Sequence, residues 1–169
     1  MARANELPRI PEGWLDGAPV ESGGADSNPA PVQLASALDH DGATRQLTLT
    51  RSDGRVQQFP ANNNAQRNSR GKWEDGTFQY GYHKDHPDDD SPDGAYGSYG
   101  IHVFQVPGAE GVGVHSGREN VPDQLGRSGV DHATKGCIRT TDEGVAAING
   151  AISAGDPVTH ITVRNNRQE

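Results

Sequence analysis

The sequence contains little of what marks several large protein classes. Its 169 residues include a single cysteine, so an internal disulfide is excluded. No apolar run is long enough to span a membrane. Lys and Arg (15) are outnumbered by Asp and Glu (23), and the net charge of −8 argues against sequence-independent binding of nucleic acid and against docking on anionic lipid. The N-terminal residues have no apolar signal core. We therefore expect that a signal was removed or that export follows a specialised route.

Glycine and proline, in contrast, are abundant. The 22 Gly and 11 Pro, with a mean hydropathy of −0.80, predict many turns and short strands rather than a helical bundle. Residues 1–40 are rich in both and show no sustained period, so we expect an extended, largely disordered N-terminal arm, with Trp14 as a candidate anchor. The rest of the chain, residues 41–169, is expected to form one catalytic domain.

Hydrophobic patterning in residues 41–169 predicts a mainly β fold with one helix. An Asp-Gly turn at 53–54 separates two alternating segments and predicts a hairpin. A capping-box pattern from Thr140 to Glu143, followed by apolar residues with mostly helical spacing, predicts a helix that Gly155 ends. The expected strands are 45–50, 55–59, 77–82, 99–106, 111–115 and 157–163.

The lone cysteine, Cys137, is either a small buried hydrophobe or a reactive thiol. Gly136 before it lets the backbone approach a ligand closely. The helix predicted just after it would bring a positive dipole end near the sulfur, and a histidine on an upstream strand could act as base. These are the parts of an activated thiolate, so the pattern favours chemistry over packing.

Two motifs carry a family resemblance. His115-Ser116-Gly117 followed by Thr134-Lys-Gly-Cys-Ile-Arg139 resembles the signature of the L,D-transpeptidases, the YkuD-like catalytic domain of bacterial cell-wall enzymes. The stretches 96–104 and 111–115 are similar to the strand pair that enters the family's site, and the resemblance covers about residues 45–164. It implies a β-sandwich or barrel of short mixed strands with one helix after the cysteine. Lys135 stands where the family has His, and 22 residues separate His115 from Cys137, which is longer than the family spacing leads one to expect.

The resemblance implies a role for each motif residue. Cys137 would be the nucleophile and His115 the base, with the main-chain carbonyl of Ser116 orienting the imidazole. Backbone N–H groups around Gly136 would face the oxyanion of a tetrahedral intermediate. The substrate-binding candidates are Arg139, Thr134, Lys135, His102, Gly117 and His132.

Several of these candidates keep two interpretations. Arg139 either grips a peptide carboxylate or braces the turn, and Thr134 is expected to hydrogen-bond within the catalytic loop. Lys135 is either a polar wall of the site or a solvated lysine. His102 is either structural or a substrate contact, with the structural role slightly favoured, and His132 competes with His115 as base.

The function implied is a cysteine enzyme of the cell envelope that acts on peptidoglycan stem peptides by transpeptidation, D-amino-acid exchange or L,D-carboxypeptidation. The resemblance implies no metal or organic cofactor. The missing signal adds an expectation of delivery as a type VI secretion toxin, with a secretion apparatus or an immunity protein as further partners. The alternatives are a zinc-dependent peptidase using His115, His132 and an acid such as Asp123, and a non-catalytic wall-binding module. The dense polar run 83–90 is interpreted as a solvated loop rather than a metal site.

Overall fold

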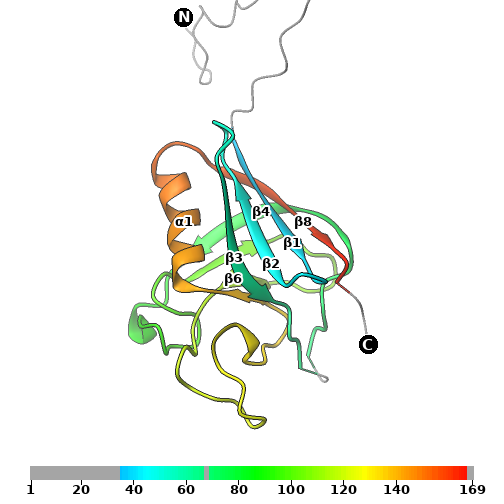
Figure 1. Cartoon of the computed structure of the whole chain (residues 1–169), viewed down its shortest axis with the longest axis vertical. Coiled ribbons are helices and arrows are strands. Elements are labelled where there is room, and N and C mark those ends of the chain that lie inside the picture. Colours follow the sequence, from blue (N-terminus) through cyan, green and yellow to red (C-terminus); the bar gives the residue numbers. More distant parts are fainter. Residues whose placement is uncertain (1–34, 67–68, 167–169) are drawn as a thin grey trace, which may run out of the picture. The chain divides into compact units, whose positions relative to one another are not determined.

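The computed structural model describes residues 35–66 and 69–166, in which eight strands close into a barrel in the order β1-β2-β3-β7-β6-β5-β4-β8 (Figure 1). Among the described residues, one α-helix, α1 (Asp142–Ser153), lies along the barrel, and two short 3-10 helices form in the loops. This confirms the predicted mainly β class with one helix after Cys137. The strands are β1 (Ser36–Asp41), β2 (Gln46–Thr50), β3 (Val56–Asn62), β4 (Gly76–Lys84), β5 (Ile101–Phe104), β6 (Gly113–His115), β7 (Ile138–Thr140) and β8 (Val158–Arg164).

The predicted hairpin is confirmed. Strands β2 and β3 pair antiparallel, with Leu47 opposite Phe59 and Thr50 opposite Val56 across the Asp-Gly turn. Leu47 and Leu49 point into the barrel and are fully buried, while Thr48 between them is only partly buried. The period of two seen in the sequence is therefore the period of the barrel wall. Each of these leucines contributes roughly 1.5–3 kcal/mol through burial.

Strand β1 begins earlier than the predicted domain. It pairs antiparallel with β2 and parallel with β8, so that Leu38 lies between Leu49 and Ile161. The predicted division after residue 40 falls inside this strand, and residues 36–40 belong to the barrel. The sequence signal was weak because Leu38 is its only large apolar residue, while its other fully buried side chains are Ser36 and His40. Residues 1–34 of the predicted arm, with Trp14, lie outside the described residues.

The helix forms as predicted but begins one residue later. Thr141 is the N-cap, and its side chain accepts the Gly144 N–H at 3.1 Å. The hydroxyl of Thr140 instead donates to the carbonyl of Pro60, 2.7 Å away on β3, because Thr140 is the last residue of β7. Gly155, with φ +80°, follows the C-cap and ends the helix as predicted.

Strand β7 was not predicted, and it changes what surrounds the cysteine. Its three residues, all buried, pair parallel with β6 and antiparallel with β3. Because β7 follows Cys137 directly, α1 starts only at Asp142. The helix therefore does not begin directly after the cysteine, as the sequence pattern suggested. Within the part of the chain that the structure describes, no helix has the length and apolar character to cross a membrane.

Candidate active site

The parallel pairing of β6 with β7 brings the two motifs together. Val114 is paired with Ile138 and His115 with Arg139. Since side chains alternate along a strand, the side chains of His115, Arg139 and Cys137 lie on the same side of this pair. Cys137 directly precedes β7, and the backbone of Gly113, the first residue of β6, forms a hydrogen bond with its thiol. Residues 22 positions apart in sequence thus meet at one corner of the barrel.

His115 is held as a neutral base. It is 3% exposed, and its Nδ1 lies 2.7 Å from the main-chain oxygen of Ser116. A carbonyl only accepts, so Nδ1 carries the proton and Nε2 presents a lone pair. Burial, followed by the positive charge of Arg139, lowers the pKa of His115 to about 3. The edge of the Tyr96 ring packs against the imidazole, with centroids 4.8 Å apart.

Arg139 adopts the bracing geometry of its two predicted roles. Its guanidinium is buried and donates to the main-chain oxygens of Ser116 and Ala95, at 2.9 Å and 3.2 Å. Ser116 therefore accepts from both His115 and Arg139. The Nε of Arg139 is buried without a hydrogen-bond partner among the described residues. Burial and the nearby charge of Arg118 lower the pKa of Arg139 to about 10, which leaves it charged at neutral pH.

The turn before the cysteine is fixed by side-chain hydrogen bonds. Thr134 donates to the carbonyl of Cys137 at 2.8 Å and accepts the N–H of Gly136 at 3.2 Å, as expected for a residue that orders the loop. The N–H of Gly136 is therefore already engaged, which argues against its predicted place among the oxyanion donors. Gly136 has φ +129°, and a Cβ there would lie 3.2 Å from Arg70 and 3.3 Å from Val112.

Two residues that the sequence analysis did not single out anchor this turn from outside. The indole Nε1 of Trp73 donates to the carbonyl of Gly136 at 2.7 Å, and the Asn63 amide donates to the carbonyls of Gly136 and Cys137 at 3.1 Å and 3.0 Å. The side-chain oxygen of Asn63 also accepts the backbone N–H of Trp73, so the two residues form one buried unit. Both lie in the stretch 60–76, which was predicted to be a polar loop, and a tryptophan within so polar a stretch was the available signal.

The thiol of Cys137 is not held as a thiolate. Burial raises its pKa, and this outweighs the hydrogen bond from Gly113 and the charges of Arg139 and Arg70, which act in the opposite direction. The sequence pattern had suggested an activated thiolate next to a helix end. The structure instead places a protonated thiol and a neutral imidazole on one side of β6 and β7, an arrangement that suits proton transfer during attack.

The other predicted histidines lie elsewhere. His102, buried on β5, uses both ring nitrogens: Nε2 donates to Asn149 at 2.6 Å, and Nδ1 accepts from the Tyr80 hydroxyl at 2.8 Å. This satisfied network matches the structural interpretation, and burial lowers the pKa of His102 to about 4. His132 lies in the loop before the turn that leads to Cys137, with Nδ1 3.0 Å from the carbonyl of Ala133.

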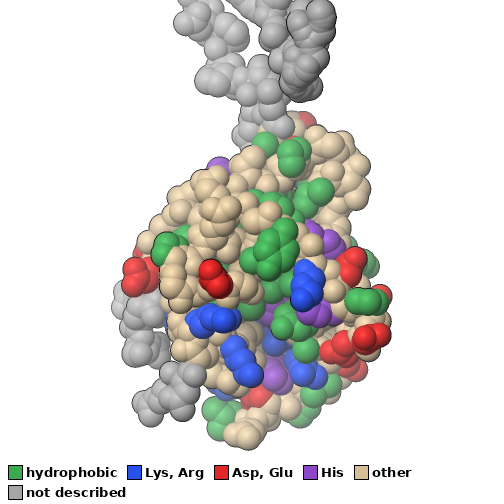
Figure 2. Space-filling view, turned by 180° about the vertical axis from the view of Figure 1, so that it is seen from behind, with side chains coloured by type: hydrophobic (Ala, Val, Ile, Leu, Met, Phe, Trp, Pro, Cys, Tyr) green, Lys and Arg blue, Asp and Glu red, His purple; other side chains and the backbone are tan. Residues whose placement is uncertain are grey.

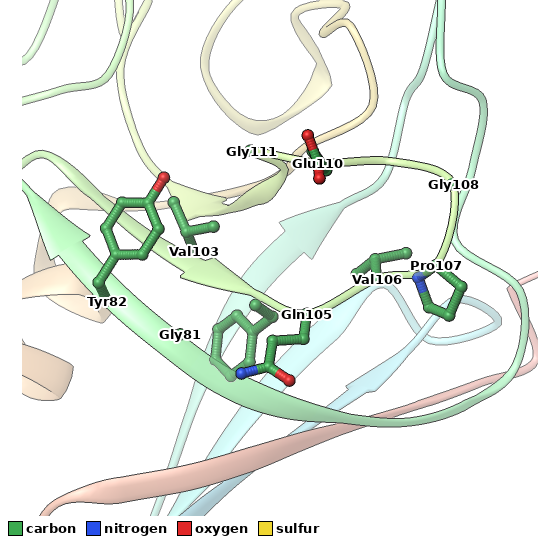
Figure 3. Close-up of a pocket in the computed structure, with 10 residues that line it drawn as sticks. Gly81, Tyr82, Val103, Gln105, Val106, Pro107, Gly108, Glu110 and Gly111 are labelled. Atoms are coloured by element: carbon green, nitrogen blue, oxygen red, sulfur yellow. The ribbon is translucent and has the colours of Figure 1, made fainter.

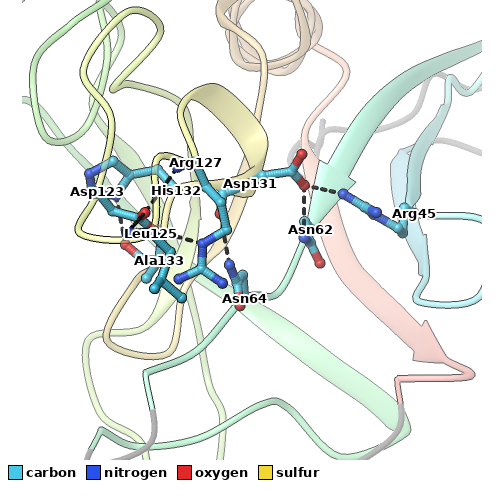
Figure 4. A network of polar contacts seen from close by, with 9 residues as sticks. All are labelled: Arg45, Asn62, Asn64, Asp123, Leu125, Arg127, Asp131, His132 and Ala133. Atoms are coloured by element: carbon cyan, nitrogen blue, oxygen red, sulfur yellow. Dashed lines mark hydrogen bonds and ion pairs between the residues drawn. The ribbon is translucent and has the colours of Figure 1, made fainter.

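The loop that holds His132 is built around carboxylates (Figure 4). Asp123 accepts the N–H groups of Leu125, Arg127 and Ala133 and an ion pair from Arg127. Its oxygens are thus occupied, and the described residues contain no group of three or more His, Cys, Asp or Glu placed to hold a metal. The geometry gives the zinc-peptidase alternative no support.

The remaining two candidates differ in exposure. Lys135 is exposed, whereas Gly117 is buried with φ +108°, and a Cβ on Gly117 would lie 2.2 Å from the carbonyl of Gly94. The site therefore tolerates only glycine at this position. A hollow of about 920 Å³ lies beside His132 and Ala133, just before the turn that leads to Cys137.

A second cavity, of about 750 Å³, opens between the end of β4, β5 and the loop that follows β5 (Figure 3). Tyr82 and Val103 lie at one side of it and Glu110 at the other, and none of the predicted site residues lines it. On the face of the molecule in Figure 2, several Lys and Arg side chains gather with His side chains among them, although the chain is acidic overall.

Comparison with known proteins identifies the family. The model of the YkuD L,D-transpeptidase catalytic domain matches residues 37–159, and the chain belongs to this family. No curated protein matches. Among solved structures, Bd1075 of Bdellovibrio bacteriovorus is similar at a TM-score of 0.55 and 14% identity, covering 80% of this chain and 52% of that one. This similarity supports the fold.

Two further structures are similar at lower scores. They are L,D-transpeptidase 1 of Mycobacterium tuberculosis (TM-score 0.45, 18% identity, 76% of this chain and 61% of that one) and an L,D-transpeptidase of Xylanimonas cellulosilytica (TM-score 0.46, 16% identity, 83% and 65%). The chain spans about half to two thirds of the length of these structures.

Proposed function

We propose that this chain is a cysteine acyltransferase that acts on peptidoglycan stem peptides through a thioester on Cys137. Membership in the L,D-transpeptidase family supports the substrate class. The observation that carries the proposal is the parallel pairing of β6 and β7, which puts Cys137 and a tautomerically fixed His115 on the same side. His102 is also buried and neutral, but both of its ring nitrogens are hydrogen-bonded, whereas among the described residues His115 has a hydrogen bond only at Nδ1.

The protonation states favour a stepwise acyl transfer. The Cys137 sulfur attacks the carbonyl of the third-position diamino acid, while its proton passes to Nε2 of His115. The tetrahedral intermediate collapses with cleavage of the peptide bond, and His115 returns the proton to the departing D-Ala amine. A thioester remains on Cys137. An acceptor amine then forms a new amide, or water releases the free acid, and in both cases the thiol is regenerated.

The charge around the thiol suits this substrate. Arg70 and Arg139 lie close enough to Cys137 for their charges to oppose the rise of its pKa, and Arg118 acts on Arg139 in turn. A stem tetrapeptide ends in a carboxylate, so a cationic surrounding favours its approach in an otherwise acidic protein. Arg139 itself is committed to two backbone carbonyls, which leaves Arg70 and Arg118 as the proposed contacts for the peptide carboxylate.

Mass spectrometry tests the proposal. The purified chain is incubated with a disaccharide-tetrapeptide, and the masses of the protein and of the muropeptides are measured. We expect release of D-Ala, an acyl adduct located on Cys137, and cross-linked or tripeptide products, unchanged by a chelator. Two results would contradict the proposal: turnover that a chelator abolishes, or turnover by a variant that lacks Cys137 and forms no adduct.

The route by which the protein reaches its substrate is a separate matter. Delivery as a type VI secretion toxin, with an immunity protein as partner, rests on the sequence pattern alone and stays a prediction. A plate competition assay between a producing strain and a sensitive strain, with a Cys137→Ala control, would test it.

A further inference from the structure

The first residue of α1, Asp142, contacts two segments far from it in sequence. Its carboxylate accepts the Ser116 hydroxyl at 2.5 Å, the Ser98 hydroxyl at 2.6 Å and the Ser98 N–H at 3.1 Å. Although burial acts to raise the pKa of Asp142, the hydrogen bonds from Ser116 and Ser98 outweigh it and lower that pKa, so the carboxylate is charged at neutral pH. Asp142 does not cap its own helix, because Thr141 does.

The segments that carry Ser98 and Ser116 pack against each other with no free space between them. A Cβ on Gly97 would lie 1.9 Å from the Ser116 hydroxyl and 2.7 Å from Asp142, and one on Gly117 would lie 2.7 Å from the Gly97 nitrogen. Both glycines have positive φ, of +75° and +108°. The backbone is thus shaped so that the Asp142 carboxylate reaches both Ser98 and Ser116.

Ser116 connects this carboxylate to the base. Its side chain is held by Asp142, while its main-chain oxygen accepts from His115 Nδ1 and from Arg139. The residue that sets the tautomer of the imidazole is therefore fixed from both its side chain and its backbone. A serine held only through its backbone could turn its carbonyl away from the imidazole.

We propose that Asp142 is a positioning residue: through the Ser116 hydroxyl it holds the carbonyl that keeps His115 in the tautomer able to accept the thiol proton. Through Ser98 it also fixes the loop that brings Tyr96 over the imidazole. The inference rests on the proposed function for its catalytic meaning, but the tautomer of His115 can be measured without it.

Loss of the carboxylate should open the surroundings of His115. The charged and titratable groups around this imidazole are Cys137 and Arg139 on one side, and Tyr96 and His86 from the loop between β4 and β5, where the His86 and Tyr96 rings stack at 3.9 Å. If Ser98 and Ser116 are released, water reaches the ring and the pKa of His115 rises toward its ordinary value. Below that raised pKa the imidazole is protonated and cannot act as base.

The test compares Asp142→Ala with Glu143→Ala. Glu143 is also acidic and lies in the first turn of α1, but its side chain is exposed, so it controls for the helix dipole. Imidazole nitrogen spectra of ¹⁵N-histidine-labelled protein, with His115→Ala for assignment, report the tautomer. We expect a single Nδ1-protonated form in the wild type and in Glu143→Ala, and a mixture of tautomers in Asp142→Ala.

Kinetics provide the second readout. We expect kcat to fall about 10- to 100-fold in Asp142→Ala with little change in KM, the scale of a misplaced catalytic group. The acid limb of the pH–rate profile should move to higher pH, because the His115 pKa rises. Ser116→Ala, which keeps the carbonyl, should give a similar loss, and the double variant should lose no more than either single variant. Asp142→Asn keeps one acceptor oxygen and should recover part of the rate.

The outcomes separate cleanly. A single His115 tautomer and an unmoved acid limb in a folded Asp142→Ala protein would overturn the inference, as would additive effects with Ser116→Ala. A wild type that turns over no muropeptide would instead refute the proposed function, and the nitrogen spectra would still decide whether Asp142 positions His115.

Discussion

Two regions of the barrel are built on different principles. In β1, β2, β3 and β8, strands of five to seven residues pair over most of their length. In β2, buried leucines alternate with less buried residues. At the corner that carries the candidate site, β6 and β7 have three residues each, all buried, and pair through two register positions. The first region is held by long strand pairings and by buried apolar side chains such as Leu47, Leu49 and Ile161. The second is held, around closely packed glycines, by hydrogen bonds that Thr134, Asn63, Trp73 and Arg139 donate and that Asp142 accepts.

This difference implies that the two regions fail differently. Damage to the long strands should unfold the protein, because they supply much of the buried apolar surface. Damage to the corner should leave a folded but inactive protein, because its hydrogen bonds set geometry more than stability. The following changes test that division in order of decreasing effect.

Removal of β1 should have the largest effect. A chain that starts at residue 35 should melt as the full-length protein does and keep its activity. A chain that starts at Asp41 loses the strand between β2 and β8 and exposes Leu49 and Ile161, at a cost exceeding the 5–15 kcal/mol by which a domain is stable. Circular dichroism melts should show no cooperative transition for the shorter chain. A normal melt would show that the barrel closes without β1.

Cys137→Ala should abolish activity and leave the fold intact. The side chain packs only partly into the core, and the turn around it is held by backbone atoms of Gly136 and Cys137, which the substitution keeps. We expect no D-Ala release from tetrapeptide and a melting temperature within a few degrees of the wild type. Residual turnover would place the nucleophile elsewhere.

The two histidines near the cysteine in sequence should differ strongly. His115→Ala should lower kcat/KM by about 100-fold or more, the low end for a general base. His132→Ala should cost far less, because its ring bonds to Ala133 in a loop outside the β6–β7 pair. Initial rates of tetrapeptide cleavage decide between them, and the reverse order would move the base to His132.

A pair of glycines compares the regions directly. Gly54 in the hairpin turn and Gly97 in the catalytic loop have similar φ, +92° and +75°, but nothing lies within 4 Å of a Cβ on Gly54. Gly54→Ala should cost only the strain of about 1–2 kcal/mol. Gly97→Ala should cost about 1–3 kcal/mol more through overlap with Ser116 and should reduce activity as well. Urea denaturation and rate assays measure both, and loss of activity in Gly54→Ala or full activity in Gly97→Ala would contradict the division.

The elements that could be predicted from the sequence are those whose signals lie within one short segment of the chain. The hairpin, the strand 77–82, the closing strand and the helix were predicted because their apolar spacing and turn residues act locally. Strand β1 was missed because Ser36 and His40 are buried polar residues with no periodic signal. Strand β7 was missed because three residues are too few to show a period. Without it, the helix was expected to start directly after Cys137, whereas β7 separates the two.

The sequence by itself determined the family, the candidate nucleophile and base, and the local elements, since motif residues and short-range periodicity are written in the chain. Only the tertiary structure decided the rest. It showed that Arg139 braces Ser116, that Thr134 occupies the N–H of Gly136, that burial keeps the thiol protonated, and that Asp142 reaches Ser116 from 26 residues away. Each of these depends on which distant segments share a buried space, and spacing along the chain does not encode that.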